Sequence, residues 1–149
     1  MIDHQNVIEQ AKSLVEGQHD LIANAANISA LLFYALEEVS WVGFYFLQGE
    51  ELIVGPFQGR PACVRIPLGK GVCGTAAQTR QVQRVADVHT FKGHIACDIS
   101  SRSEIVIPLV RNGELIGVLD LDSPIKARFV AYDEVFLNEI ASIFLSSLE

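Results

Sequence analysis

The chain has 149 residues, of which 50% are hydrophobic and 19% charged. This length suits one domain with a sizeable core, and the composition excludes an intrinsically disordered protein. The formal net charge of -7 argues against a nucleic-acid partner, because phosphate binding requires a basic surface.

The sequence also argues against a membrane partner and against export. It contains no run of about eighteen apolar residues that would span a bilayer. Residues 1–5 lack the basic flank and the apolar stretch of a signal peptide. We therefore expect a cytoplasmic protein, in which disulfides are usually transient and catalytic.

Two helices are expected at the N-terminus and one at the C-terminus. The first is indicated by a helical period that Gly17 ends, with apolar residues at Val7, Ile8, Ala11, Leu14 and Val15. Asp20 is the expected N-cap of the second. The last is expected to begin near Asp133, with Phe136, Ile140, Ile143 and Phe144 on one stripe.

The middle of the chain favours strands. We expect strands at 41–47, 52–54, 64–66 and 81–88, a short helix at 75–80, and a long loop at 90–103. Residues 104–122 form a predicted hairpin. Helices at both ends with strands between them indicate an α+β domain built on an antiparallel sheet.

The hairpin register decides which side chains share a face. A two-residue Asn112-Gly113 turn and a three-residue turn over 111–113 differ by one residue of register. Only the three-residue turn puts the apolar residues of both strands on one face, so we predict that turn. It places Glu104 opposite Asp120, with Asp122 further along the same face. Three gathered carboxylates would share a proton or bind a cation; the alternative is that they are solvated on an exposed face.

Cys63, Cys73 and Cys97 are the side chains with the most distinctive chemistry. Their spacing of 10 and 24 residues contains no Cys-x-x-Cys pair, which disfavours common structural zinc sites. Thiol redox chemistry and inert buried thiols remain, as does a metal site that includes His94. Cys73 is expected at a helix N-terminus, where a thiolate is favoured, and Cys97 lies in the long loop. Spacing alone does not rank them.

Several strings of the sequence, taken together, resemble the free methionine-(R)-sulfoxide reductases, a family built on a GAF domain. These strings are 59–63 (GRPAC), 69–74 (GKGVCG), 93–98 (GHIACD), 103–108 (SEIVIP) and 117–122 (GVLDLD). One departure is Lys92, where the family commonly has proline. The resemblance implies that residues 1–149 form a single GAF domain, with the terminal helices on one face of the sheet and a ligand pocket under loops on the other.

The resemblance also implies roles for the cysteines. Cys97 matches the catalytic cysteine, Cys63 its usual resolving partner, and Cys73 a third cysteine that can take part in disulfide formation. The implied reaction is reduction of free L-methionine (R)-sulfoxide by the Cys97 thiolate, followed by a disulfide that thioredoxin reduces. No metal or organic cofactor is implied, and a homodimer is left open.

A second set of residues matches the substrate pocket. Glu104, Asp120 and Asp122 match its acidic residues, one protonating the sulfoxide and others holding the ammonium group. Trp41 and Tyr45 would wall the S-methyl group, and the backbone of Ile95, Ala96 and Asp98 would receive the carboxylate. The alternative function is a GAF module that binds a small ligand as a sensor.

Overall fold

The computed structural model describes residues 3–95, 97 and 99–149. Its elements, in chain order, are α1 (His4–Val15), α2 (Leu21–Ala35), β1 (Trp41–Gln48), β2 (Glu51–Gln58), β3 (Arg65–Pro67), α3 (Gly71–Thr79), β4 (Gln83–Val85), the short 3-10 helix η1 (Val88–Thr90), β5 (Ser103–Arg111), β6 (Glu114–Ser123) and α4 (Ala131–Ser147).

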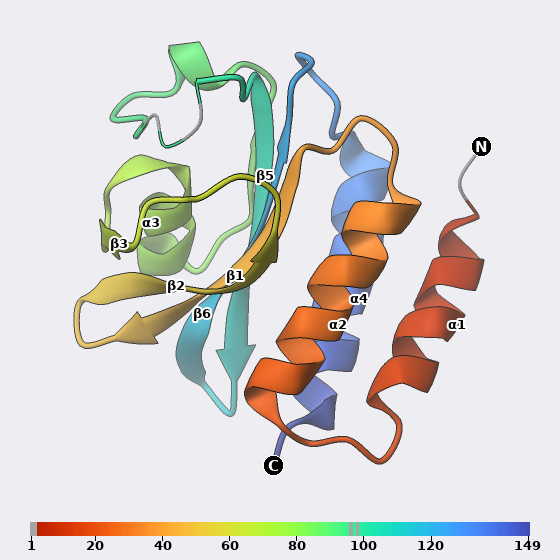
Figure 1. Cartoon of the computed structure of the whole chain (residues 1–149). Helices are drawn as coiled ribbons and strands as arrows, with labels where there is room; N and C mark the ends of the chain where they lie inside the picture. The colour runs from red at the N-terminus through yellow and green to blue at the C-terminus, as the bar shows by residue number, and fades with distance from the viewer. Residues whose placement is uncertain (1–2, 96, 98) are drawn as a thin grey trace.

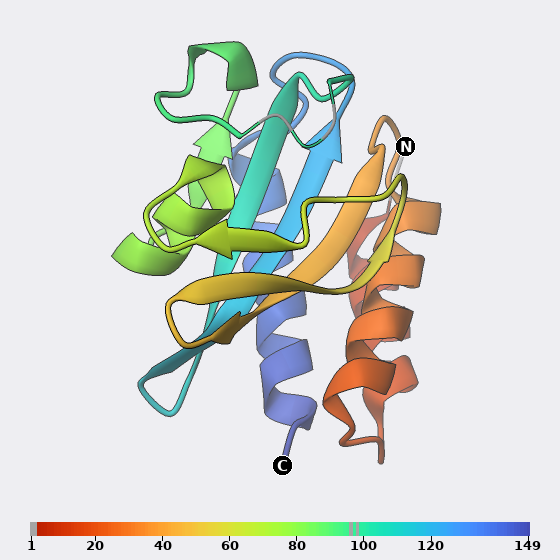
Figure 2. The same cartoon turned by 60° about the vertical axis from the view of Figure 1, so that its left-hand side comes forward.

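The strands form one antiparallel sheet in the order β3-β2-β1-β6-β5-β4. Helices α1, α2 and α4 cover one face of it, whereas α3 and the segment around η1 lie on the other face (Figure 1). The view turned by 60° separates the same layers (Figure 2). This arrangement confirms the expected α+β fold. Among the described residues, no helix is both long and apolar enough to cross a membrane.

Side-chain caps fix where the helices begin. Asp20 accepts a 2.9 Å hydrogen bond from the backbone N–H of Ala23, as its predicted N-cap role requires. Asp133 lies in the first turn of α4 and accepts a 2.8 Å bond from the N–H of Val130. Helix α3 starts four residues earlier than expected, because Gly71 turns the chain at a φ of 63°.

The main core lies between the sheet and the three covering helices. Alternation along the strands sends every second side chain to this side, including Phe44 and Ile107. Fully buried members of this size each stabilise the fold by about 1.5–3 kcal/mol. A smaller apolar cluster on the opposite face joins the strands to α3 and contains Trp41, Tyr45 and Cys73. The second face is therefore a partly apolar floor on which polar side chains are placed.

The turn predicted for the β5–β6 hairpin is wrong, although the predicted faces are correct. Asn112 and Gly113 both have positive φ, at 53° and 79°, and form a two-residue type I′ turn. Leu109 pairs with Gly117 whereas Val110 pairs with Leu115, so β6 carries one extra residue in a β-bulge. The bulge shifts the ladder by one residue and restores the parity that places the apolar side chains together.

The bulge also changes which carboxylates are paired. Glu104 lies opposite Asp122, not opposite Asp120 as predicted, and Asp120 lies opposite Val106. All three acids still point to the face that α3 covers. The sheet therefore brings them together in a register that differs by two residues from the expected one.

Candidate active site

A pocket opens between the second face of the sheet, helix α3 and the loop that precedes β5. It brings together side chains that lie far apart in the sequence, and these are Trp41, Tyr45, Pro61, Ala62, Ile66, Lys70, Gly71, Val72, Cys73, His94, Ile95, Cys97, Ser101, Glu104, Asp120 and Asp122. The three predicted acids, both predicted aromatic walls and two of the cysteines are among them. The third cysteine, Cys63, is adjacent to the lining residue Ala62.

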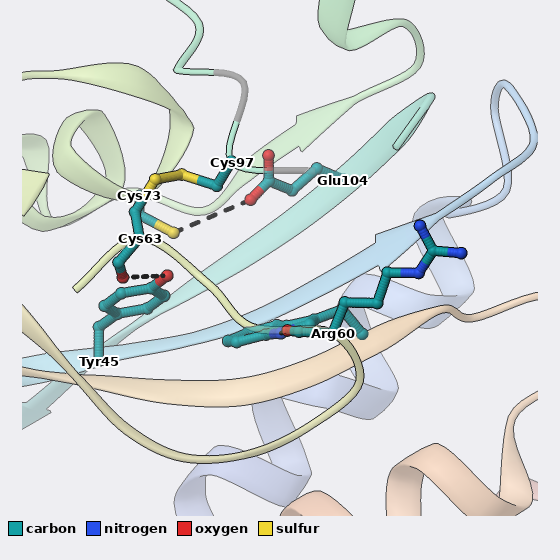
Figure 3. The surroundings of a disulfide bond; sticks show 7 residues. Tyr45, Arg60, Cys63, Cys73, Cys97 and Glu104 are labelled. Atoms are coloured by element: carbon teal, nitrogen blue, oxygen red, sulfur yellow. Dashed lines mark hydrogen bonds between the residues drawn. A yellow bond between two sulfur atoms is a disulfide. The ribbon is translucent and has the colours of Figure 1, made fainter. Parts of the chain in front are cut away.

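Cys63 and Cys97 form a disulfide across this pocket, with their Cα atoms 5.4 Å apart (Figure 3). Cys97 is exposed and Cys63 half-buried, so the bridge lies at the protein surface. The Tyr45 hydroxyl donates a 3.1 Å hydrogen bond to the carbonyl of Cys63 and holds this end of the bridge against the sheet. The pairing was not derivable from cysteine spacing, because the loops at 59–64 and 91–102 meet only in the folded chain.

The carboxyl groups of Glu104 and Asp120 are buried on the floor of the pocket. Burial raises the pKa of Glu104 well above its usual value, and the negative charges of Asp120 and Asp122 raise it further. Burial also raises the pKa of Asp120, although hydrogen bonds from Glu104 and Cys73 oppose that shift. The arrangement favours a carboxyl group that keeps a proton shared within the cluster near neutral pH.

The Cys73 thiol lies in this acidic cluster instead of facing solvent. It is 3.8 Å from Oε2 of Glu104 and is buried. Burial, followed by the charges of Asp120 and Glu104, raises the pKa of Cys73 well above its usual value. The expectation that the helix N-terminus would favour a thiolate here is therefore wrong, because desolvation and two nearby carboxylates outweigh the helix dipole.

One group among the described residues has the composition and spacing to ligate a metal ion. Its members are Cys73, Glu104 and Asp120, whose ligand atoms lie within 4.8 Å of one another. Without a cation, burial and mutual repulsion keep the thiol and at least one carboxyl protonated. The metal site considered around His94 is not formed, because Cys97 and Cys63 are bonded to each other.

The pocket walls combine aromatic rings with a neutral histidine. Trp41 and Tyr45 stack with their ring centroids 5.9 Å apart, and burial raises the pKa of the Tyr45 hydroxyl far above its usual range. His94 is half-buried, and burial lowers its pKa, with a smaller contribution from His89. His94 is thus neutral at pH 7 and provides no cation for a neighbouring thiolate.

Two buried polar atoms of the pocket have no hydrogen-bond partner. They are Oγ of Ser101 and Oδ1 of Asp120, and no other buried side-chain atom in residues 3–95, 97 and 99–149 is left unsatisfied. Such atoms cost about 1–3 kcal/mol each unless water or a ligand satisfies them. Sequence reasoning missed Ser101, and its proximity to Glu104 in the chain was the one available signal.

The loop before β5 is described only in part. Ile95 and Cys97 line the pocket, and the N–H of Cys97 donates a 3.1 Å hydrogen bond to the carbonyl of Ile95. In this disulfide form that N–H is already engaged within the loop. Ala96 and Asp98, which were also expected to bind the substrate carboxylate, lie outside the described residues.

The chain is similar to known proteins over most of its length. The GAF domain family matches residues 16–146. The "Free methionine-R-sulfoxide reductase" of Escherichia coli (strain K12) is 52% identical over 130 residues, which span 87% of this chain and 79% of that protein.

Two solved structures of proteins bound to their substrate are similar to this chain over nearly its whole length. The fRMsr of Staphylococcus aureus, in complex with substrate, has a TM-score of 0.96 and 52% identity, and the match covers 100% of this chain and 97% of that one. The free methionine-R-sulfoxide reductase of Neisseria meningitidis, in complex with its substrate, has a TM-score of 0.93 and 44% identity, with coverages of 97% and 87%. The chain belongs to the GAF-domain family and, within it, to the free methionine-R-sulfoxide reductases.

Proposed function

We propose that this protein reduces free L-methionine (R)-sulfoxide to L-methionine with its own cysteines as the electron source. The observation that carries the proposal is the disulfide between Cys63 and Cys97, which spans a pocket floored by three carboxylates. In its reduced form this cysteine pair supplies the two electrons that sulfoxide reduction consumes, and the buried acids supply a proton to the sulfoxide oxygen. The family membership supports the same assignment.

The chemical step begins with the reduced protein. The Cys97 thiolate attacks the sulfoxide sulfur and forms a sulfur–sulfur bond while the oxygen is protonated. The oxygen then moves from the substrate sulfur to the Cys97 sulfur, the sulfur–sulfur bond breaks, and methionine leaves with Cys97 as a sulfenic acid. The Cys63 thiol then attacks the Cys97 sulfur, which forms the disulfide and releases water. The structure corresponds to the protein after this step.

The acidic cluster supplies the proton that the sulfoxide oxygen needs. A sulfoxide oxygen is a poor leaving group until it is protonated, and a carboxyl group with a raised pKa can donate near neutral pH. Glu104 fits this role because burial and the charges of two aspartates favour its protonated form. Asp120 and Asp122 would then hold the substrate ammonium group.

Substrate size and polarity determine when the pocket is occupied. The enclosed part of the pocket has a volume of about 50 Å³, which is enough for a few waters, whereas the whole hollow out to solvent measures about 540 Å³. Methionine sulfoxide has about ten non-hydrogen atoms, so the enclosed part beside the acids does not hold all of it in this disulfide form. We therefore expect the substrate to enter only after the Cys63–Cys97 bond is reduced and the loop at 91–102 moves away from the sheet.

The unsatisfied atoms of Ser101 and Asp120 are the groups that substrate would complete. Asp120 accepts from the ammonium, and the Ser101 hydroxyl donates to an oxygen of the substrate. The free amino acid has an α-ammonium group, whereas a residue inside a polypeptide has an amide nitrogen there. This requirement explains a preference for free over peptide-bound sulfoxide.

The cycle closes when a dithiol reduces the disulfide. We propose thioredoxin in the cytoplasm as this reductant, because dithiol exchange restores two thiols without any further cofactor. The decisive assay couples thioredoxin turnover to NADPH oxidation and compares the separated R and S diastereomers of free and peptide-bound methionine sulfoxide. NADPH oxidation with the free R form alone supports the proposal; ligand binding without oxidation would instead indicate a sensor.

The Cys97→Ser variant is the companion test. Its rate of reduction of the free R form should be more than about 10³-fold lower than that of the unchanged protein, because the nucleophile is gone. Normal turnover by this variant would overturn the assignment of Cys97.

A further inference from the structure

Charge is unevenly distributed along this acidic chain. The segment 60–102, which contains all three cysteines, has seven basic and two acidic residues, a formal net charge of +5. The rest of the chain has four basic and sixteen acidic residues, a net charge of -12. Most of this segment, yellow-green to green in Figure 1, covers the sheet face opposite α1, α2 and α4. Both cysteines of the disulfide therefore belong to the basic part of an otherwise acidic chain.

Three exposed cations of this segment lie in the loops or pocket lining next to the two cysteines of the disulfide: Arg60, Lys70 and Lys92. The carbonyl of Arg60 accepts a 3.1 Å hydrogen bond from Nε1 of Trp41, which fixes Arg60 beside the pocket wall. Lys70 lines the pocket itself, and Lys92 lies in the loop that leads to Cys97. In the part of the chain that the structure describes, none of the three forms an ion pair.

Exposed apolar side chains flank the same bridge. Val64, 58% exposed, follows Cys63 directly, and Ile99, 86% exposed, is two residues after Cys97. Ile95, 36% exposed, is two residues before Cys97. A separation of two residues keeps Cα atoms within about 7 Å, so these side chains border the disulfide. Apolar contacts ringed by charge are typical of a surface that binds another protein.

We propose that the face formed by Val64, Ile95, Ile99, Arg60, Lys70 and Lys92 is the docking surface for a dithiol protein whose thiols lie in an apolar and acidic surface. This inference rests on the proposed function, which requires a reductant. Charge complementarity selects this occupant over a second copy of the chain, whose corresponding face would also be basic. The net charge of -7 would repel an acidic partner from most directions, whereas the basic face attracts it to the disulfide.

The docked partner exchanges its dithiol for the disulfide in two balanced steps. A partner thiolate attacks one sulfur of the Cys63–Cys97 bond, forms a mixed disulfide and expels the other cysteine as a thiolate. The partner's second thiolate then attacks the partner's own sulfur atom in the mixed disulfide, which closes a disulfide within the partner and releases the remaining cysteine of this protein as a thiolate. The partner is oxidised by two electrons, and its two protons end on the released cysteines.

The test measures the second-order rate constant for reduction of the oxidised protein by thioredoxin and, separately, by dithiothreitol. For the thioredoxin reaction we expect a fall of about 10-fold or more between about 20 mM and 500 mM salt, because salt screens steering. Arg60→Glu and Lys92→Glu should each lower this rate constant about 3–10-fold at low salt. Both changes should affect reduction by dithiothreitol much less, because that small reductant does not use a docking surface.

Lys12→Glu is the matched control, because it changes the net charge by the same amount on α1, beyond the sheet. It should leave both rate constants unchanged. Ile99→Ser should slow thioredoxin but not dithiothreitol, and its exposed position keeps the fold intact. The docking surface would be overturned if the rate constant with thioredoxin did not change with salt concentration. It would also be overturned if Lys12→Glu lowered that rate constant as much as Arg60→Glu and Lys92→Glu do.

The two proposals fail in different ways. Suppose that dithiothreitol supports reduction of free methionine (R)-sulfoxide, but thioredoxin reduces the oxidised Arg60→Glu and Lys92→Glu variants at the normal rate. The docking surface is then wrong and the proposed function stands. If dithiothreitol supports no turnover of the sulfoxide, the proposed function itself is wrong.

Discussion

The thiol of Cys73 lies 3.8 Å from Oε2 of Glu104, within the buried part of the pocket. This contact divides the three cysteines into two kinds. Cys63 and Cys97 form a bridge at the protein surface, whereas Cys73 is a buried, protonated thiol among carboxyl groups. The division predicts different consequences for removing each one.

Cys73→Ala should retain thioredoxin-dependent turnover within about 10-fold of the unchanged protein, because its protonated thiol is a poor resolving nucleophile. Cys63→Ser should reduce one sulfoxide per molecule and then stop cycling with thioredoxin. Single-turnover methionine formation, measured beside steady-state NADPH oxidation, separates these outcomes. Loss of cycling in Cys73→Ala with normal cycling in Cys63→Ser would assign resolution to Cys73 instead.

Glu104→Gln should lower kcat by about 10²–10⁴-fold, because the amide cannot protonate the sulfoxide oxygen. The same change should alter the pH dependence of stability. Burial raises the folded pKa of Glu104 above that of the unfolded chain, so its contribution is fully present below the unfolded value and is lost as pH rises through the folded value. The Glu104→Gln variant has no ionisable group at this position, so its free energy of unfolding should not decrease for this reason as pH rises.

Chemical denaturation of the oxidised protein at a series of pH values measures this effect. The free energy of unfolding of Glu104→Gln, relative to the unchanged protein, should increase as pH rises above about 4.3. Glu114→Gln, on the exposed start of β6, is the charge-matched control. A difference between Glu104→Gln and the unchanged protein that stays constant with pH would contradict a buried, proton-holding Glu104.

The oxidised protein should bind methionine sulfoxide at least about 10-fold more weakly than the reduced Cys97→Ser variant. The reason is the small pocket of the disulfide form. Calorimetric titration of both forms with the free R diastereomer gives the two Kd values directly. Equal affinities would mean that the pocket opens without cleavage of the disulfide.

Ser101→Ala should raise KM for the free (R)-sulfoxide by about 5–100-fold, since a hydrogen bond to the substrate is lost. The fold should not weaken, because the Ser101 hydroxyl has no partner within the described chain. Ser103→Ala is the contrasting variant: its hydroxyl donates a 2.6 Å bond to the carbonyl of Ile125, so this change should lower Tm. An unchanged KM in Ser101→Ala would exclude that hydroxyl from substrate binding.

Gly117→Ala should destabilise the fold by about 1–3 kcal/mol or more, because its Cβ would overlap the carbonyl oxygen of Tyr45 on the neighbouring strand. Gly49→Ala is the control. The positive φ of 65° at Gly49 disfavours alanine, but no atom lies within 4 Å of the added Cβ, so this change has a backbone cost without a steric overlap. Urea denaturation should rank Gly117→Ala as clearly the less stable of the two. The reverse ranking would contradict the close approach of β1 and β6 at the bulge.

Local sequence determined the elements whose signals are contained in a few turns of chain. The N-cap at Asp20 and the apolar stripe of α4 predicted their helices, because capping and helical period act over short distances. Alternation predicted which face of the hairpin would be apolar. It also predicted that Glu104, Asp120 and Asp122 would share the other face, since parity along a strand is a local property.

Tertiary structure alone decided the pairings between distant segments. The turn at Asn112 and Gly113 is compatible with two registers, and the bulge that sets the observed one lies next to Gly117, where β6 also pairs with β1. The sequence predicts a lowered pKa for Cys73 from its place at a helix N-terminus, but burial among carboxylates, which only the packed chain creates, raises it. The Cys63–Cys97 pair and the orphan hydroxyl of Ser101 likewise arise where loops separated by some thirty residues meet over the sheet. Short-range sequence fixes conformation, but desolvation and proximity, which set reactivity, are properties of the packed chain.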